Sequence, residues 1–351
     1  MRFLALSSVL LVGTSLAAPL GVFSGRVGSF DVVMKLDEPT SDWSVSNSTY
    51  FYTSKGLDVP LAYRRSGSNV TVNEYAAFEL GADERKATAT FRGTLSGDSF
   101  RGTWSTTDGK RTLPFTLKRV NVATLPLALP SSPGLLALRA KDPYNFVKVN
   151  RAFVVAKRAG DVTWLREPRS GVTYPRLPSG AAVNAALQDR QLQDVQYALS
   201  CLSDLSQRSD IDLQEGWEQD VTITYRSATL LSVRSDVGYY CGGAHPDAYI
   251  DGLTLNVRTG RALKLTDLWP TLTAKSLDAE YRRGFKQEGE PPCEETLSNR
   301  AAVTFEDYRA FLTKDGVTLW PTYVPHVAAP CAVEVTIPFA RLGRGGSLAP
   351  R

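Results

Sequence analysis

Residues 87–106, ATATFRGTLSGDSFRGTWST, alternate apolar and polar side chains on both sides of the turn Ser96-Gly97-Asp98. Short alternating runs that flank a glycine-bearing turn are typical of a β-hairpin. We therefore predict two antiparallel strands, over residues 87–95 and 100–106.

The same pattern continues outward, from about residue 22 to residue 120. Five further strands are expected, over residues 26–36, 49–53, 58–64, 69–75 and 111–119. Strands spaced by roughly 8 to 12 residues favour an all-β meander that forms a barrel or a sandwich. All four cysteines lie outside this region, so its core must hold it together without a disulfide.

Composition excludes several classes of function. The 351 residues include 40 basic and 36 acidic side chains, 2 His and 4 Cys. The charges are spread along the chain, unlike those of a nucleic-acid-binding protein, and the sequence has no glycine-rich phosphate loop. We expect neither a cofactor nor a nucleic-acid partner, and the length suggests two domains.

The first 17 residues resemble a secretory signal peptide. Arg2 gives a positive start, residues 3–12 are apolar, and Ser15-Leu16-Ala17 is a small-x-small cleavage motif. The apolar run is about half as long as a bilayer-spanning helix requires. The sequence thus predicts a secreted or periplasmic protein without a membrane span.

The four cysteines fit that compartment. They form an even set without a CxxC pair, which is typical of structural disulfides. They are Cys201, Cys241, Cys293 and Cys331. Three pairings are possible, of which Cys201–Cys241 with Cys293–Cys331 closes the shorter loops and is favoured.

The second domain is expected to be α+β. We divide the chain into an all-β domain (18–122), a proline-rich linker (123–134) and this domain (135–351). Apolar residues at helical spacing predict a helix over residues 179–205, and a second helix is expected over 273–287. An antiparallel sheet is expected from strands at residues 217–226, 229–240, 248–257, 262–265, 305–312, 317–320 and 333–337.

The segment from Tyr239 to Asp247, YYCGGAHPD, is the most distinctive local signal. Two glycines permit unusual backbone angles beside a cysteine, two tyrosines and a histidine. We predict a binding site made of Tyr239, Tyr240, Gly242, Gly243, His245 and Asp247. The structural alternative is a disulfide-pinned turn in which His245 bonds a neighbouring strand.

Catalytic and metal motifs are missing from the sequence. It contains no HExxH pair and no G-x-S-x-G elbow, and it has two histidines, His245 and His326. We expect neither catalytic residues nor a metal site. A cell-wall hydrolase that uses His245 or His326 with a carboxylate is the alternative.

From about residue 172 to residue 342, the order of motifs is similar to a known extracytoplasmic domain. That RsiV-like domain, of unknown function, ends lysozyme-sensing anti-sigma factors and some peptidoglycan deacetylases. The motifs that carry the resemblance are Tyr174-Pro175, Asn184, Leu230–Val233, Gly242–Pro246, Asn256–Gly260, Leu265–Trp269, Phe311–Gly316 and Val335–Phe339.

The resemblance implies a domain that recognises a molecule outside the membrane, which is lysozyme in the best-understood members. This chain shows no sigma-binding part and no deacetylase domain, so those roles are not expected. Lysozyme is cationic, so acids such as Asp247 and Asp251 would have to gather on one face. We expect a non-catalytic binding protein of the cell envelope, with a lysozyme-like protein or peptidoglycan as partner. A purely structural envelope protein is a third hypothesis.

Overall fold

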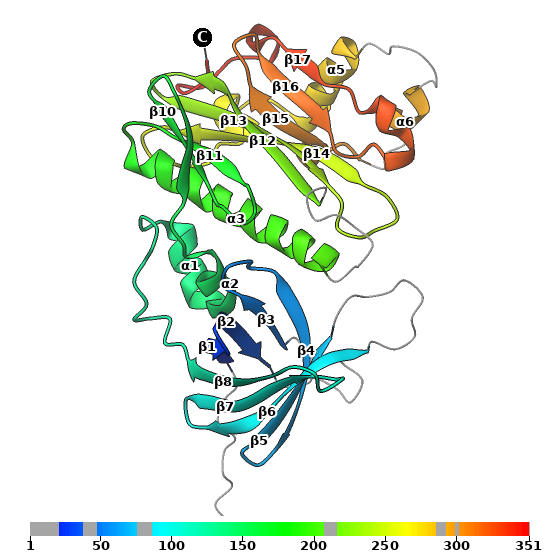
Figure 1. Cartoon of the computed structure of the whole chain (residues 1–351). Coiled ribbons are helices and arrows are strands. Elements are labelled where there is room, and N and C mark those ends of the chain that lie inside the picture. The colour runs from blue at the N-terminus through cyan, green and yellow to red at the C-terminus, as the bar shows by residue number, and fades with distance from the viewer. Residues whose placement is uncertain are drawn as a thin grey trace, which may run out of the picture.

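The first part of the chain is a closed barrel of eight antiparallel strands, in which β1 pairs with β8 (Figure 1). The structure is a computed structural model that describes residues 21–37, 48–75, 86–206, 216–285, 293–298 and 302–350. The predicted signal peptide lies outside these residues. The barrel strands are β1 (Gly21–Val27), β2 (Phe30–Leu36), β3 (Ser48–Tyr52), β4 (Asp58–Ser66), β5 (Asn69–Tyr75), β6 (Ala87–Ser96), β7 (Ser99–Thr106) and β8 (Thr112–Arg119).

Every second side chain of each barrel strand points inward, as the period of a β-strand requires. In β2, Met34 belongs to the barrel core, whereas its neighbour Val33 belongs to a separate outer cluster. Three phenylalanines fill much of the interior: Phe115 lies 5.4 Å from Phe91 and 4.7 Å from Phe100 between ring centroids, in edge-to-face contacts. The barrel is therefore held by its core, as expected for a region without cysteines.

Residues 26–36, which the sequence predicts as one strand, are the end of β1, a turn and β2. Gly28 has a φ of +58°, a left-handed conformation that glycine adopts without strain. The prediction missed this two-residue turn because apolar Val27 and Phe30 flank it directly and continue the strand-like pattern. The additional strand brings β1 beside β8, which closes the barrel instead of leaving a sandwich.

Two short helices that the sequence does not predict follow the barrel, at the end of the predicted linker (123–134) and at the start of the second domain. They are α1 (Pro133–Lys141) and α2 (Pro143–Val149). Each begins with a proline, which fits the first turn of a helix because the nitrogen there needs no partner. Pro133 lies within the predicted linker and yet begins α1.

Helix α2 attaches the second half of the chain to the outside of the barrel. The ring of Tyr144 packs with Val33 and Phe51, and its hydroxyl donates a 2.6 Å hydrogen bond to Asp58. Nζ of Lys148, a residue that is 3% exposed, lies 2.5 Å from the same carboxylate. Burial lowers the pKa of Lys148, and the attraction of Asp58 opposes that shift.

The long helix α3 (Ala181–Ser206) matches the predicted helix within two residues at each end. It runs between the barrel and the sheets of the second half (Figure 1). Leu187, Val195 and Leu199 are completely buried in the largest core of the molecule. Its apolar stripe is therefore the surface on which the second half assembles.

Where the structure describes it, the second half contains three separate three-stranded antiparallel sheets, whereas the sequence predicts one sheet. Their strands are β9 (Val154–Ala159), β10 (Val162–Arg166) and β11 (Thr173–Arg176); β12 (Trp217–Arg226), β13 (Leu230–Tyr239) and β14 (Asp247–Asn256); and β15 (Tyr308–Leu312), β16 (Val317–Pro321) and β17 (Val335–Ile337). Residues 262–265 add only an isolated bridge, between Ala262 and Leu255. The sequence pattern predicts each hairpin but not which hairpins pair with one another, so it does not show where one sheet ends and the next begins.

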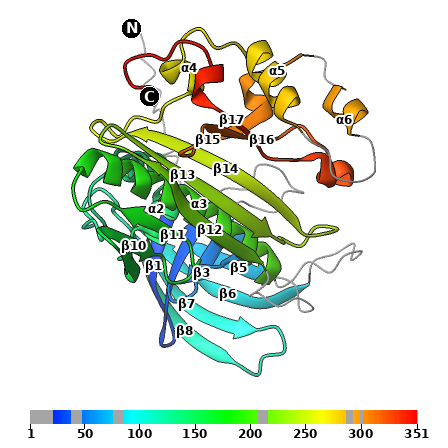
Figure 2. The same cartoon turned by 90° about the horizontal axis from the view of Figure 1, so that it is seen from above.

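The β12–β14 sheet lies between α3 and the β15–β17 sheet (Figure 2). On the side away from α3, the backbone N–H of Leu312 donates to Oγ of Ser232 over 3.0 Å. A Cβ added at Gly252 would lie 2.2 Å from the carbonyl oxygen of Ala310, so glycine permits this close approach.

Short helices complete the fold around the β15–β17 sheet. They are α4 (Leu265–Leu268), α5 (Ala274–Gly284), α6 (Glu294–Ser298) and the 3₁₀ helices Phe305–Asp307, His326–Cys331 and Phe339–Arg341. Helix α5 is the second predicted helix, and Thr273 caps its first turn. The last residues of that prediction, 286 and 287, lie outside the described chain. None of the helices in the described ranges combines the length and apolar character needed to cross a membrane.

The substitution Gly102→Ala should destabilise the barrel. Gly102 pairs with Gly93 across β6 and β7, and an added Cβ would lie 2.1 Å from the carbonyl oxygen of Arg92. Backbone must move to make room, and overpacking of this kind costs about 1–3 kcal/mol. Calorimetry of the full chain should show a lower unfolding temperature.

Gly238→Ala is the matched control, because an added Cβ there meets no atom within 4 Å. Equal unfolding temperatures for the two variants would contradict the tight strand approach in the barrel.

Candidate functional site

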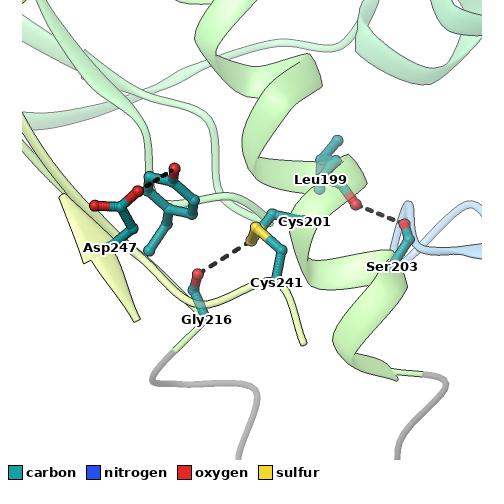
Figure 3. The surroundings of a disulfide bond; sticks show 7 residues. Leu199, Cys201, Ser203, Gly216, Cys241 and Asp247 are labelled. Carbon is teal, nitrogen blue, oxygen red and sulfur yellow. Dashed lines mark hydrogen bonds between the residues drawn. A yellow bond between two sulfur atoms is a disulfide. The ribbon is translucent and has the colours of Figure 1, made fainter. Parts of the chain in front are cut away.

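A disulfide joins the last turns of α3 to the predicted binding segment. Cys201 of α3 is bonded to Cys241, which follows β13 by two residues, and their Cα atoms are 4.6 Å apart. Figure 3 shows this bond with Gly216, whose carbonyl oxygen lies 3.2 Å from Sγ of Cys201. The second disulfide is Cys293–Cys331. Both are the pairs of sequence neighbours that the sequence favoured.

A pocket of about 370 Å³ lies beside the Cys201–Cys241 bond. One wall comes from α3 and the other from the ends of β12, β13 and β14. Its lining residues are Tyr197, Ser200, Cys201 and Asp204 from the helix, and Trp217, Tyr239, Cys241 and Tyr249 from the strands or the residue after them. The disulfide thus connects the two walls directly.

The pocket is mainly aromatic. The ring of Tyr239 is 6.1 Å from that of Trp217 and 6.0 Å from that of Tyr249, between centroids. The Tyr239 hydroxyl donates a 3.2 Å hydrogen bond to Asp247, which fixes the ring. Tyr197 is 55% exposed on the helical wall. Within the described chain, the indole nitrogen of Trp217 is buried without a hydrogen-bond partner.

Acidic side chains lie at this aromatic pocket and in the pocket next to it. Asp204 stands at its rim, exposed at the surface but partly shielded by neighbouring atoms. That partial burial, together with the nearby Asp58, raises the pKa of the Asp204 carboxyl. A neighbouring pocket of about 390 Å³ shares Tyr249 and contains Glu218, Asp220 and Asp236. None of the described residues that line either pocket is a lysine or an arginine.

A buried ion-pair network connects α3 with the β12–β14 sheet near the pocket. Arg190 lies 3.0 Å from Asp194 and 2.7 Å from Asp251, and Asp194 is completely buried. Tyr174 donates a 2.6 Å hydrogen bond to Asp194. Burial, followed by the charge of Asp194, raises the pKa of Tyr249 to about 12. Asp251 forms an ion pair with Arg190 in this network. It is one of the acids that, from the sequence, a cationic partner would require on one face.

The predicted binding residues separate into two groups. Tyr239 lines the pocket, and Asp247 orients it. The others lie in a turn next to the pocket, where Tyr240 donates a 3.0 Å hydrogen bond to the carbonyl of Gly243. Gly242 adopts a φ of +91°, which explains the need for glycine. His245 and Gly243 are exposed, so a partner can reach the turn from solvent.

Four aromatic or acidic residues of the pocket were not predicted: Tyr197, Asp204, Trp217 and Tyr249. Tyr197, Cys201 and Asp204 are separated by four and three residues, which places them on one helical face. That spacing around a cysteine was the available signal. Trp217 and Tyr249 converge on the pocket through strand pairing: Trp217 pairs with Tyr239, and Tyr249 with Val237.

The histidines do not form a described site together. Nδ1 of His245 lies 2.9 Å from the carbonyl oxygen of Pro246, and the side chain of His326 lies outside what the structure describes. Across the described ranges, no group of three or more His, Cys, Asp or Glu side chains is arranged to hold a metal ion.

The solved structures that are similar to this chain include two proteins of the DUF3298 family, a family of unknown function. One, from Pseudomonas aeruginosa, is 13% identical over 57% of this chain and 93% of its own, with a TM-score of 0.33. The other, from Bacteroides fragilis, is 17% identical over 50% of this chain and 83% of its own, also with a TM-score of 0.33. No protein-family model and no curated protein matches the chain.

The carboxyl of Asp204 should titrate at a higher pH than that of an ordinary aspartate, because its pKa is raised. An acid with a raised folded-state pKa favours folding while protonated, and this contribution is lost as pH rises through that pKa. Asp204→Asn should therefore raise the unfolding temperature at pH 7 relative to the native protein, and the gain should disappear near pH 3.

Asp161→Asn is the control of opposite sign. Its side-chain hydrogen bonds with Arg226 lower the pKa of Asp161, so this variant should lose a small amount of stability at pH 7. A lower unfolding temperature for Asp204→Asn at neutral pH would contradict the assigned environment of Asp204.

Proposed function

We propose that this protein is a non-catalytic, extracytoplasmic binding protein of the cell envelope. Its pocket beside the Cys201–Cys241 disulfide accepts a cationic side chain of its partner. The observation that carries the proposal is the lining itself: aromatic rings and a carboxylate, next to a second acidic pocket, with no described cationic residue in either.

Aromatic faces attract cations because their π electrons present negative charge. Each such contact contributes about 0.5–1 kcal/mol at an exposed site and about 2 kcal/mol when it is desolvated. Trp217, Tyr239 and Tyr249 provide three rings around one cavity, and Asp204 supplies a formal charge. A lysine or arginine of a partner fits this combination, because its charge can pair with the carboxylate while its side chain contacts the aromatic faces.

Among cationic partners, a lysozyme-like protein is the one that we propose. Lysozyme carries a net positive charge, and the acids Glu218 and Asp220 extend the negative surface beyond the pocket, whereas Asp236 beside them is ion-paired with Arg234. Complementary charge of this kind increases association rates and selects partners. Peptidoglycan is the other expected partner, and its capture is a separate outcome of the test below.

The pocket also supports binding over catalysis. A nucleophile needs an adjacent base, and none of the described residues that line the pocket is a histidine. Ser200 is therefore not activated by an imidazole there. Cys201 and Cys241 are bonded to each other, which removes both thiols. The two disulfides are in turn typical of proteins outside the cytoplasm, the compartment that we propose.

Calorimetric titration of the chain lacking residues 1–17 with lysozyme tests the proposal. Tyr197→Ala and Asp204→Asn should each weaken binding about tenfold or more, which is about 1.4 kcal/mol. Tyr197 is exposed, so its truncation should leave the fold intact. Asp161→Asn removes one negative charge, as Asp204→Asn does, but Asp161 lines neither pocket. This variant should leave the affinity for lysozyme unchanged. Rising salt concentration should weaken binding.

Three results would count against the proposal. Lysozyme binding that neither pocket variant affects would exclude this pocket as the site. Binding of peptidoglycan but not of lysozyme would show that peptidoglycan, and not a lysozyme-like protein, is the partner. Turnover of wall material that His245→Ala abolishes would favour the hydrolase alternative.

A further inference from the structure

A second cavity, of about 480 Å³, lies near the opposite end of α3. Asn184 lines this cavity and Cys201 lines the pocket described above, so the two are about 25 Å apart along a helix that rises about 1.5 Å per residue. Segment 128–131, the residues Ala152 and Phe153, and the first two turns of α3 contribute to its walls. This volume is in the range that holds a small organic ligand.

The lining is mostly apolar. Leu129, Phe153, Leu165 and Ala185 supply aliphatic and aromatic surface. Two polar residues of the lining form hydrogen bonds with the backbone around the cavity. The amide of Asn184 accepts from the N–H of Leu177 and donates to its carbonyl, each over 2.8 Å. Nε2 of Gln188 donates to the carbonyl of Pro130 over 2.7 Å.

Arg176 is the one charged residue among those that line this cavity. Its guanidinium donates to two neutral oxygens, the carbonyl of Pro175 at 2.9 Å and Oε1 of Gln191 at 2.7 Å. It forms no ion pair with a described carboxylate. The acid Asp189 is engaged elsewhere, because it accepts hydrogen bonds from Ser132 and from the N–H of Gly134 at the start of α1.

A largely buried cation without a counter-ion is costly. Burial lowers the pKa of Arg176 to about 10, although the hydroxyl of Tyr174 and the charge of Asp189 oppose the shift. An arginine has five N–H donors, so donors remain after its two hydrogen bonds. Ala181, in the first turn of α3, also lines the cavity, and the positive end of the helix dipole favours an anion there.

We propose that this cavity binds an aliphatic monocarboxylate of the fatty-acid class. The carboxylate pairs with Arg176, and the chain lies along Leu129, Phe153 and Leu165. A planar carboxylate matches the guanidinium with two parallel hydrogen bonds. The apolar remainder of the lining calls for a hydrocarbon tail, which distinguishes this ligand from phosphate or a sugar acid. The inference does not depend on the function proposed for the aromatic pocket.

Calorimetric titration of the intact protein with dodecanoate tests this inference. Dodecanoate should bind at one site, and dodecan-1-ol and dodecyltrimethylammonium should bind at least tenfold more weakly. Arg176→Gln should weaken dodecanoate binding about ten- to hundredfold, the range expected for loss of a charge-assisted hydrogen bond. It should leave the affinity for dodecan-1-ol unchanged.

Two further variants keep the test decisive if Arg176→Gln unfolds the protein. Ala185→Phe fills the cavity without changing charge and should abolish dodecanoate binding. Arg261→Gln removes an exposed arginine paired with Asp267 outside this cavity and should have no effect. Equal binding of the alcohol and the carboxylate, dodecanoate binding that both cavity variants retain, or no dodecanoate binding at millimolar concentration would each overturn the inference.

Discussion

The last turns of α3 are held from two sides, and the aromatic pocket depends on this constraint. The Cys201–Cys241 bond fixes the helix to the end of β13, and the N–H of Asp58 in the barrel donates a 2.8 Å hydrogen bond to Oγ of Ser203. Tyr197 and Asp204 are therefore presented at a fixed distance from the strand wall. Such preorganisation reduces the entropy lost when a partner binds.

The two cavities along α3 have opposite electrostatic character, and the helix contributes to both. Its N-terminal turns lie beside Arg176, and its last turn carries Asp204 and no basic residue. An acid at a helix C-terminus is unfavourable because the dipole is negative there. The carboxylate of Asp204, with its raised pKa, thus costs stability at neutral pH. Charged groups whose pKa is shifted at a cost in stability are common at functional sites, which agrees with a role in attracting a cation.

Local patterns in the sequence predicted the local elements well. The hairpins from Asn69 to Thr106, the helix α3 and the β12–β13 hairpin all follow from side-chain periodicity, and short loops favoured the observed disulfides. Closure of the barrel was not decided, because the β1–β8 pairing joins residues about 90 positions apart. Pro133 falls within the predicted linker although it begins α1, and Pro143 likewise begins a helix, α2, that was not predicted.

Local sequence patterns likewise predicted only part of the pocket. The unusual composition around Cys241 indicated the right region, and Tyr239 lines the pocket there. His245 belongs to the predicted site, yet it is exposed and lies outside the lining of the cavity. Trp217, Tyr249 and Tyr197 come from three different elements, so no local pattern groups them. Their convergence follows from strand register and from the disulfide.

The most direct test is the ¹H–¹⁵N NMR resonance of the Trp217 indole during titration with lysozyme. If a cationic side chain enters the pocket, this resonance should shift saturably, and the shift should be lost in Tyr197→Ala. Saturation of lysozyme binding with an unchanged Trp217 resonance would show that the partner binds elsewhere on the protein.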